Sequence, residues 1–163
     1  MSNPKKLLAI SVLLPALSAG IMAVSATAPY GEIAVSEPLA CVRLFCDPDG
    51  ASHFSDELMS FKLVDYAPPA PPVSVSAVMD AESVVFLSSP SGWRGDWHPA
   101  PRRQLMIVLS GELEVQASDG EVRLFASGAV VLVEDTSGRG HVSRVVGEER
   151  VYMAAIPLEV ESE

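Results

Sequence analysis

Short apolar runs alternate with polar turn residues along most of the chain. After residue 28, runs rich in Val, Leu, Ile and Phe recur between clusters of Gly, Asp, Ser and Pro, and the 3.6-residue period of an amphipathic helix is almost absent. This pattern predicts an all-β domain. The expected strands cover 40–46, 59–65, 73–78, 83–88, 103–109, 111–117, 121–126, 129–134, 141–146 and 150–157.

Two kinds of strand differ in how their apolar residues are spaced. Leu113 and Val115 alternate with charged residues before the hairpin signal Asp119-Gly120, which indicates one wet face. By contrast, 105–109 and 129–133 are apolar on consecutive residues, so both faces need a cover. The interior covers one face. A second sheet, the N-terminal strands or a second subunit covers the other, and the last of these predicts a homodimer.

The N-terminal 28 residues have the organisation of an export signal. Lys5 and Lys6 precede an apolar stretch from Leu7 to Val24, and Val24-Ser-Ala or Ala26-Thr-Ala supplies a small-residue cleavage site. We expect an exported protein, periplasmic or secreted, with no stable membrane insertion after cleavage. The alternative is an uncleaved anchor, because the stretch reaches the lower limit of about 17 residues for a spanning helix.

The charge of the chain excludes one class of partner. The chain has 11 Lys and Arg against 21 Asp and Glu, a net charge of −10, which becomes −12 without the first 28 residues because these hold two lysines and no acid. Nucleic-acid binding needs a clustered basic face, and the local basic cluster here is only Arg102-Arg103. We therefore expect no nucleic-acid partner.

Cysteines and prolines mark the segment before the main group of strands. If Cys41 and Cys46 lie on one strand, their Cα atoms are about 16 Å apart, whereas a disulfide needs roughly 4.4–6.8 Å. Either this stretch turns back on itself or both thiols are free. The Pro-rich stretch 66–73 is interpreted as a connector, which gives a signal peptide at 1–28, N-terminal strands and connector at 29–72, and the barrel at 73–163.

The densest group of candidate functional residues is Trp97-His-Pro-Ala-Pro-Arg-Arg-Gln104, followed by a strand and Gly111. This run resembles the first signature of the cupin superfamily, with His98 at the first His, Ala100 where a second His is usual, and Gln104 where a Glu is usual. The stretch 126–141, with a Gly-rich turn, a strand and His141, resembles the second signature. The resemblance covers residues 75–157 and implies a single cupin domain, an antiparallel jelly-roll β-barrel of the RmlC-like type.

The cupin resemblance also implies a metal site. In this chain the site is weakened, because Ala100 and Gln104 stand where the signature usually has a His and a Glu. A usual cupin cradle offers several imidazoles and one carboxylate for a divalent Fe, Mn, Ni or Zn ion. Here His98, Gln104 and His141 would form an uncharged site, because Ala100 adds nothing and Gln104 is neutral. The site would recover if Glu134 or Asp135 turned inward, or if His53 reached the mouth.

Three functions remain open on the sequence. The first is a small-molecule-binding cupin with a small organic, potentially anionic ligand in a pocket at the barrel mouth. The second is an enzyme that uses a weakly bound metal, or His98 and His141 as a metal-free acid and base for an isomerase-type reaction. The third is a structural homodimer with an occluded barrel. The residues expected to line the pocket are Trp97, His98, Arg102, Gln104, Met106 and His141.

Several of these residues also have a purely structural interpretation. His98 could bond a backbone carbonyl at the entry of a strand, and Arg102 could be a rim charge paired with an acid. Gln104 shares the parity of Met106 and Val108, so it faces the interior with them, either towards a ligand or as an internal strut. The sequence leaves these alternatives open.

Overall fold

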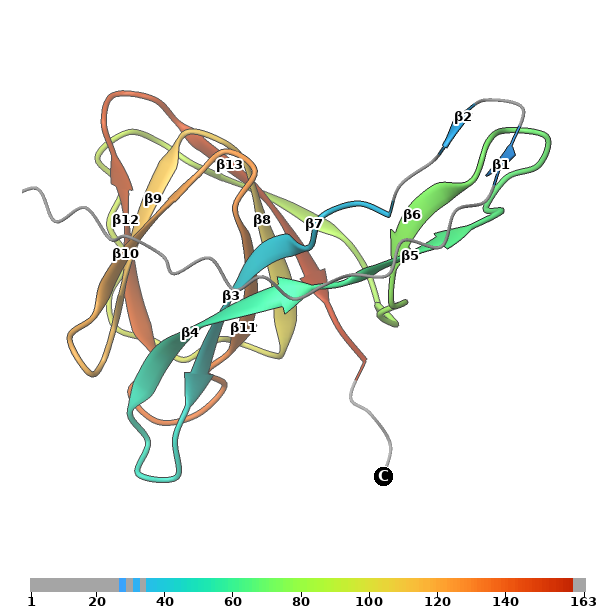
Figure 1. The fold of residues 1–163 in the computed structure, drawn as a ribbon. Coiled ribbons are helices and arrows are strands. Elements are labelled where there is room, and N and C mark those ends of the chain that lie inside the picture. Colours follow the sequence, from blue (N-terminus) through green and yellow to red (C-terminus); the bar gives the residue numbers. More distant parts are fainter. Residues whose placement is uncertain (1–26, 29–30, 33–34, 160–163) are drawn as a thin grey trace, which may run out of the picture. The chain divides into compact units, whose positions relative to one another are not determined.

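The computed structural model describes residues 27–28, 31–32 and 35–159 (Figure 1). The chain divides into two compact units, 1–34 and 35–163. In the first unit, β1 (Thr27–Ala28) and β2 (Gly31–Glu32) pair antiparallel. Residues 1–26 of the expected signal peptide lie outside the described residues, so the export signal stays a prediction.

The second unit is all-β, as the apolar pattern predicts. Its described residues form eleven strands and no helix, so that part of the chain contains no helix long and apolar enough to cross a membrane. The strands are β3 (Leu39–Cys46), β4 (Ser52–Met59), β5 (Phe61–Val64), β6 (Val73–Ser76), β7 (Val85–Ser89), β8 (Gln104–Ser110), β9 (Glu112–Ala117), β10 (Val122–Ala126), β11 (Val130–Glu134), β12 (His141–Val146) and β13 (Val151–Pro157).

Two sheets form a sandwich. One has six strands in the order β4-β3-β11-β8-β13-β7, and the other has three in the order β10-β9-β12 (Figure 1). The segment before β8 adds two isolated bridges to β12, Arg94 to Arg144 and His98 to His141. The sandwich is consistent with the predicted all-β jelly roll, but the barrel is not closed, and one pairing, that of β11 with β3, is parallel.

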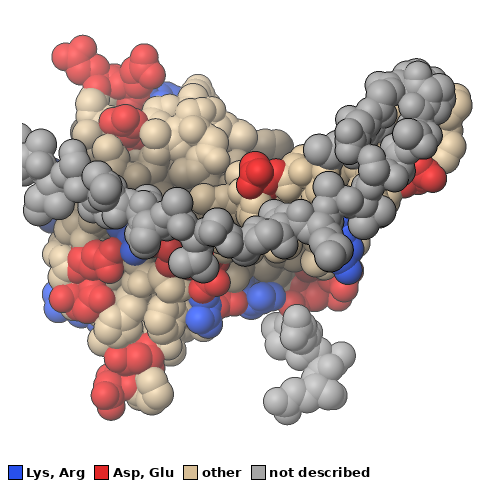
Figure 2. Space-filling view, viewed as in Figure 1, with Lys and Arg blue, Asp and Glu red and all other residues tan. Residues whose placement is uncertain are grey.

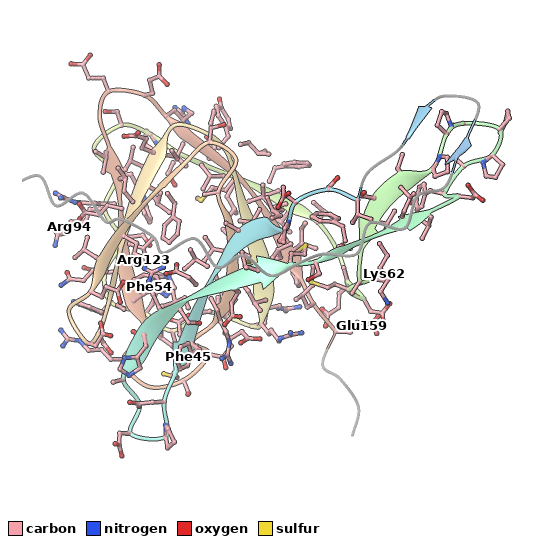
Figure 3. All side chains as sticks on the ribbon, viewed as in Figure 1. Phe45, Phe54, Lys62, Arg94, Arg123 and Glu159 are labelled. Atoms are coloured by element: carbon pink, nitrogen blue, oxygen red, sulfur yellow. The ribbon has the colours of Figure 1, made fainter. Side chains whose placement is uncertain are left out.

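The core lies between the two sheets and is built from the inward residues of both. Phe54 of β4 meets Phe125 of β10 with ring centroids 6.0 Å apart, and the Arg123 guanidinium lies over the Phe54 ring (Figure 3). Leu44 and Val151 are almost fully buried. The remaining buried core residues are Ala100, Val108, Leu113, Val115, Ala117, Val131, Val133, Val145 and Met153.

Within the second unit, the strand that the sequence did not predict is β4. Its residues are mostly polar, and only Ser52 and Phe54 are buried, because β4 is an edge strand that covers the core with one face. With β3 and β4, the sandwich takes in residues 39–59, which the expected domain boundary at residue 73 leaves outside it. The Pro-rich stretch connects β5 to β6, which pair antiparallel as a two-stranded ribbon.

Both cysteines are free, as the geometry of a continuous strand requires. Cys41 and Cys46 lie near opposite ends of β3. Burial raises the pKa of the Cys41 thiol, whereas the Cys46 thiol lies 3.0 Å from the carbonyl oxygen of Ser137. The turn Asp47-Pro-Asp-Gly50 then reverses the chain into β4, with the Gly50 N–H donating to the Asp47 carbonyl.

His53 joins two of the turns at one end of the sandwich. Its Nε2 lies 2.9 Å from Asp47 in the β3–β4 turn, and its Nδ1 lies 2.8 Å from Asp119 in the β9–β10 turn. Both ring nitrogens therefore face carboxylate oxygens, which favours the doubly protonated ring. The hydrogen bonds to Asp47 and Asp119 raise the pKa of His53, and the bond from His53 lowers the pKa of Asp47.

We expect this contact to make stability depend on pH. A raised His pKa contributes stability that is complete below its unfolded value, about 6.5, and is lost as pH rises through the folded pKa. The lowered pKa of Asp47 contributes stability above about pH 4 that is lost as pH falls. Thermal unfolding of His53→Gln should show a lower midpoint than the unsubstituted protein at pH 5–6 and a smaller difference at pH 9. An equal difference at both pH values would contradict the proposed charge on His53.

Candidate functional site

A cavity of about 680 Å³ lies between the sheets. Its inner part is apolar and is lined by buried side chains of both sheets, among them Val108, Leu113 and Phe125. Its exposed lining residues come from β7, from the residues just before it and from the segment between β7 and β8, which therefore form the mouth. The lining residues at the mouth are Ser83, Val85, Leu87, Ser88, Trp93, His98, Pro101 and Arg102.

Two histidines lie side by side in the wall of the cavity. The backbones of His98 and His141 form a bridge with two N–H to carbonyl hydrogen bonds of 3.0 Å. Their ring centroids are 4.7 Å apart. His98 is exposed, and the His141 side chain is only 12% exposed, so the pair spans the boundary between solvent and the apolar interior.

Both imidazole rings are oriented through Nδ1. His98 Nδ1 lies 2.8 Å from the carbonyl oxygen of Asp96, which can only accept, so this nitrogen carries the proton. His141 Nδ1 lies 2.6 Å from Asp135 Oδ2. In each ring Nε2 is left for a molecule in the cavity, because the acceptor on Nδ1 fixes the tautomer.

Asp135 is the deepest charged residue of this group. Its side chain is 0% exposed, and its Oδ1 has no hydrogen-bond partner among the described residues. The Asp135 backbone carbonyl also accepts from the N–H of Ala100 at 3.0 Å. A buried carboxylate with one partner is costly unless that partner is held firmly, so Asp135 and His141 fix one another's position.

Glycines bring the loop between β11 and β12 close to its neighbours. Gly140 has a φ of +70°, and a Cβ there would lie 2.0 Å from the carbonyl oxygen of His98. Gly138 has a φ of +67°, and a Cβ there would lie 2.2 Å from the carbonyl oxygen of Gly50. The bridge between His98 and His141 therefore depends on residue 140 having no side chain.

Gln104 and Met106 occupy the positions that strand parity predicts. Together with Val108 they face inward from β8 and line the cavity. The Gln104 backbone pairs with Val133 on one side and with Pro157 on the other. The Gln104 side chain is therefore among those that a molecule in the cavity would contact.

Arg102 and Trp97 differ in how the structure places them. Arg102 lines the mouth, where its Nη1 donates to Glu82 Oε2 at 2.7 Å. Trp97 is not among the residues that line the cavity; its ring lies under the guanidinium of Arg139, 4.1 Å from the ring centroid to Cζ. Trp93 lines the mouth instead.

The residues present do not fit the metal cradle that the cupin resemblance implies. His98 and His141 could each offer Nε2, and Gln104 an amide oxygen, but the two carboxylates that the sequence offered for this site already accept hydrogen bonds from other side chains. Asp135 accepts from His141, and Glu134 accepts from Arg43 and Arg103. Burial alone would raise the pKa of Glu134, but the bonds from Arg103 and Arg43 outweigh it and lower that pKa.

Two strong ligands are fewer than the three or more that divalent sites use. Among the described residues, no three His, Cys, Asp or Glu side chains are arranged to hold a metal ion. His53, which could have completed the set, is held by Asp47 and Asp119 instead. We therefore derive no chemistry through a metal at this site.

On the face shown in Figure 2, acidic side chains lie over several parts of the described chain, and basic ones are scattered between them. Most of the arginines whose contacts are described pair with an acid, as Arg144 does with Glu114 and Arg123 with Glu121. The distribution gives no local support for a polyanion-binding face.

Comparison with known proteins gives likenesses of fold. No family model matches the chain, and neither does any of the curated proteins. Among solved structures, the chain is similar to a putative ethanolamine utilization protein of Salmonella typhimurium, with 15% identity and a TM-score of 0.32 over 76% of this chain and 98% of that one. It is also similar to the Cnp3 cupin domain of Schizosaccharomyces pombe, with 13% identity and a TM-score of 0.38 over 76% of this chain and 86% of that one.

Proposed function

We propose that this chain is an exported cupin of the jelly-roll type that binds one small, mostly apolar organic molecule between its sheets. The observation that carries the proposal is the cavity of about 680 Å³, which is apolar inside and polar at its mouth. Small-molecule sites in proteins usually have about 300–1,000 Å³ and combine apolar walls with a few oriented polar groups. The signal-like pattern of the first 28 residues supports the proposed export.

The walls indicate the chemistry of the ligand. Its apolar body would lie among Leu113, Val115 and Phe125, and a single hydrogen-bonding group would reach His98 and His141. Arg102 favours an anionic group less than the sequence suggested, because Glu82 already neutralises it at the mouth. We therefore propose a ligand with one neutral or weakly acidic hydroxyl or carbonyl group.

Calorimetric titration with 4-iodophenol and 4-iodobenzoate tests this proposal. The expected result is binding of one molecule per chain, with the phenol bound at least as tightly as the benzoate. His98→Ala should weaken binding of the phenol about tenfold, the effect of one hydrogen bond of roughly 1.4 kcal/mol.

The matched control is His53→Ala, which removes a histidine that does not line the cavity and should leave affinity unchanged. The absence of binding to the unsubstituted protein would overturn the proposal. If His98→Ala instead lowers the unfolding midpoint strongly, His98 is a structural residue and the polar contact must be assigned to His141 or Gln104.

One observation favours a second candidate, a metal-free acid and base. The Asp135 carboxylate accepts from His141 Nδ1 at 2.6 Å, the arrangement that orients a catalytic imidazole and stabilises its protonated form. His98, whose Nδ1 donates to a carbonyl, would then accept a proton through Nε2 while His141 supplies one. An isomerisation needs no other reactant, so a carbonyl compound with an acidic neighbouring C–H fits this candidate.

A further inference from the structure

The edge of the six-stranded sheet at β7 is apolar and open. β7 is the last strand of that sheet, and among the described residues it pairs on one side only, with β13. Val84, Val85, Phe86 and Leu87 are all exposed, and Phe86 is the most exposed of them at 74%. Long apolar edge strands invite pairing with another strand, and proteins usually cover or charge them.

Both faces of this edge lack a cover. Val85 and Leu87 face inward with Met153 and Ala155 and form one wall of the cavity. Phe86 faces outward beside its partner Ala154 on β13. Tyr152, two residues before Ala154 on the same strand, is also exposed. A small ligand in the cavity would cover the inner face alone, whereas a strand added to the edge would cover both.

The charge pattern favours a second copy of this chain as the added strand. The stretch from Ser83 to Trp93 has no charged residue in a chain with a net charge of −10, so two copies can approach here without like charges meeting. The first charge before this stretch is acidic, Glu82, and the first after it is basic, Arg94. In an antiparallel pair centred on this stretch, no acidic residue of one copy lies opposite an acidic residue of the other.

We propose that β7 pairs antiparallel with β7 of a second copy, with Phe86 opposite Phe86. Residues directly opposite one another share a face, so Val85 then meets Leu87 of the second copy at the cavity wall. Each copy completes the other's mouth, and the two outward Phe86 side chains pack together. The six-stranded sheets become one continuous twelve-stranded sheet about a two-fold axis, an isologous interface.

Sedimentation velocity of the purified protein tests the interface without any ligand, so its outcome is separate from that of the binding proposal. We expect a dimer for the unsubstituted protein and a monomer for Phe86→Lys. The matched control is Leu124→Lys, which places the same charge on another edge strand, β10, at a residue that is 55% exposed. This control should stay dimeric.

Cysteine pairing tests the register. In a Cys41→Ser, Cys46→Ser background, Phe86→Cys should form a disulfide-linked dimer under mild oxidation, whereas Val122→Cys on β10 should not. A monomeric unsubstituted protein, a dimer that survives Phe86→Lys, or a dimer lost only in Leu124→Lys would each overturn the proposal. If the N-terminal segment of the same chain covered β7, the unsubstituted protein would be a monomer.

Discussion

Gly140→Ala should lower the free energy of unfolding by roughly 3 kcal/mol or more. The added Cβ would meet the carbonyl oxygen of His98 at 2.0 Å, a distance that no side-chain rotation relieves because the backbone fixes the position of both atoms. The positive φ of +70° adds the cost of a left-handed conformation for an L-residue. Urea unfolding monitored by tryptophan fluorescence measures the change.

The control for this prediction is Gly120→Ala. Gly120 also has a positive φ, +99°, but nothing lies within 4 Å of a Cβ at that position. This substitution isolates the conformational cost, about 1–2 kcal/mol. If the two variants lose the same stability, the close approach of Gly140 to His98 is not as described, and the bridge that holds His98 beside His141 loses its support.

Asp135→Ala should both destabilise the protein and weaken ligand binding. Removing the carboxylate leaves His141 Nδ1 without its acceptor in a buried place, which costs roughly 2 kcal/mol. The His141 ring is then free to rotate, so we expect the affinity for 4-iodophenol to fall about tenfold. Urea unfolding and calorimetric titration measure the two effects on one preparation.

Asp56→Ala is the matched control for Asp135→Ala. Asp56 forms an ion pair with Arg123, but its side chain is 82% exposed. Exposed pairs contribute at most about 1 kcal/mol, and this one lies outside the cavity lining, so affinity should not change. Unchanged affinity in Asp135→Ala would show that Asp135 does not orient His141 for the ligand.

Most strands of this fold could be predicted because their apolar residues repeat at strand spacing. The hairpin of β9 and β10 follows from alternation and Asp119-Gly120, and β8 and β11 follow from continuous apolar runs. β4 could not be predicted, because an edge strand needs few apolar residues and this one has a polar outer face. The parallel pairing of β3 with β11 depends on contacts that local pattern does not encode.

The candidate site was predictable where strand parity determines it. Gln104 and Met106 face the cavity because they share the parity of Val108, and His98 precedes the same strand. Trp93 and Trp97 both precede β8, and nothing in the sequence shows which of them the loop turns inward. The partner of His141 was equally hidden, because Asp135 reaches it only through the turn that Gly138 and Gly140 permit.

The continuous apolar runs also anticipated an outer face that needs a cover. On β8 the outward Leu105 is buried, whereas Leu109 is 46% exposed. The outer face of β8 is therefore covered near Leu105 and open near Leu109. Tyr152 and Phe86 on the neighbouring strands are exposed as well. The proposed pairing of two copies at β7 would cover the exposed Phe86 on this face.

A crystal of the protein soaked with 4-iodophenol tests the central claim most directly, because iodine is located by its anomalous signal. We expect one iodine per chain inside the cavity, near Leu113, Val115 and Phe125, with the hydroxyl group within hydrogen-bonding distance of His98 or His141. Iodine found only on the outer surface, with side chains filling the space between the sheets, would contradict the account. The protein would then be a structural one with an occluded interior.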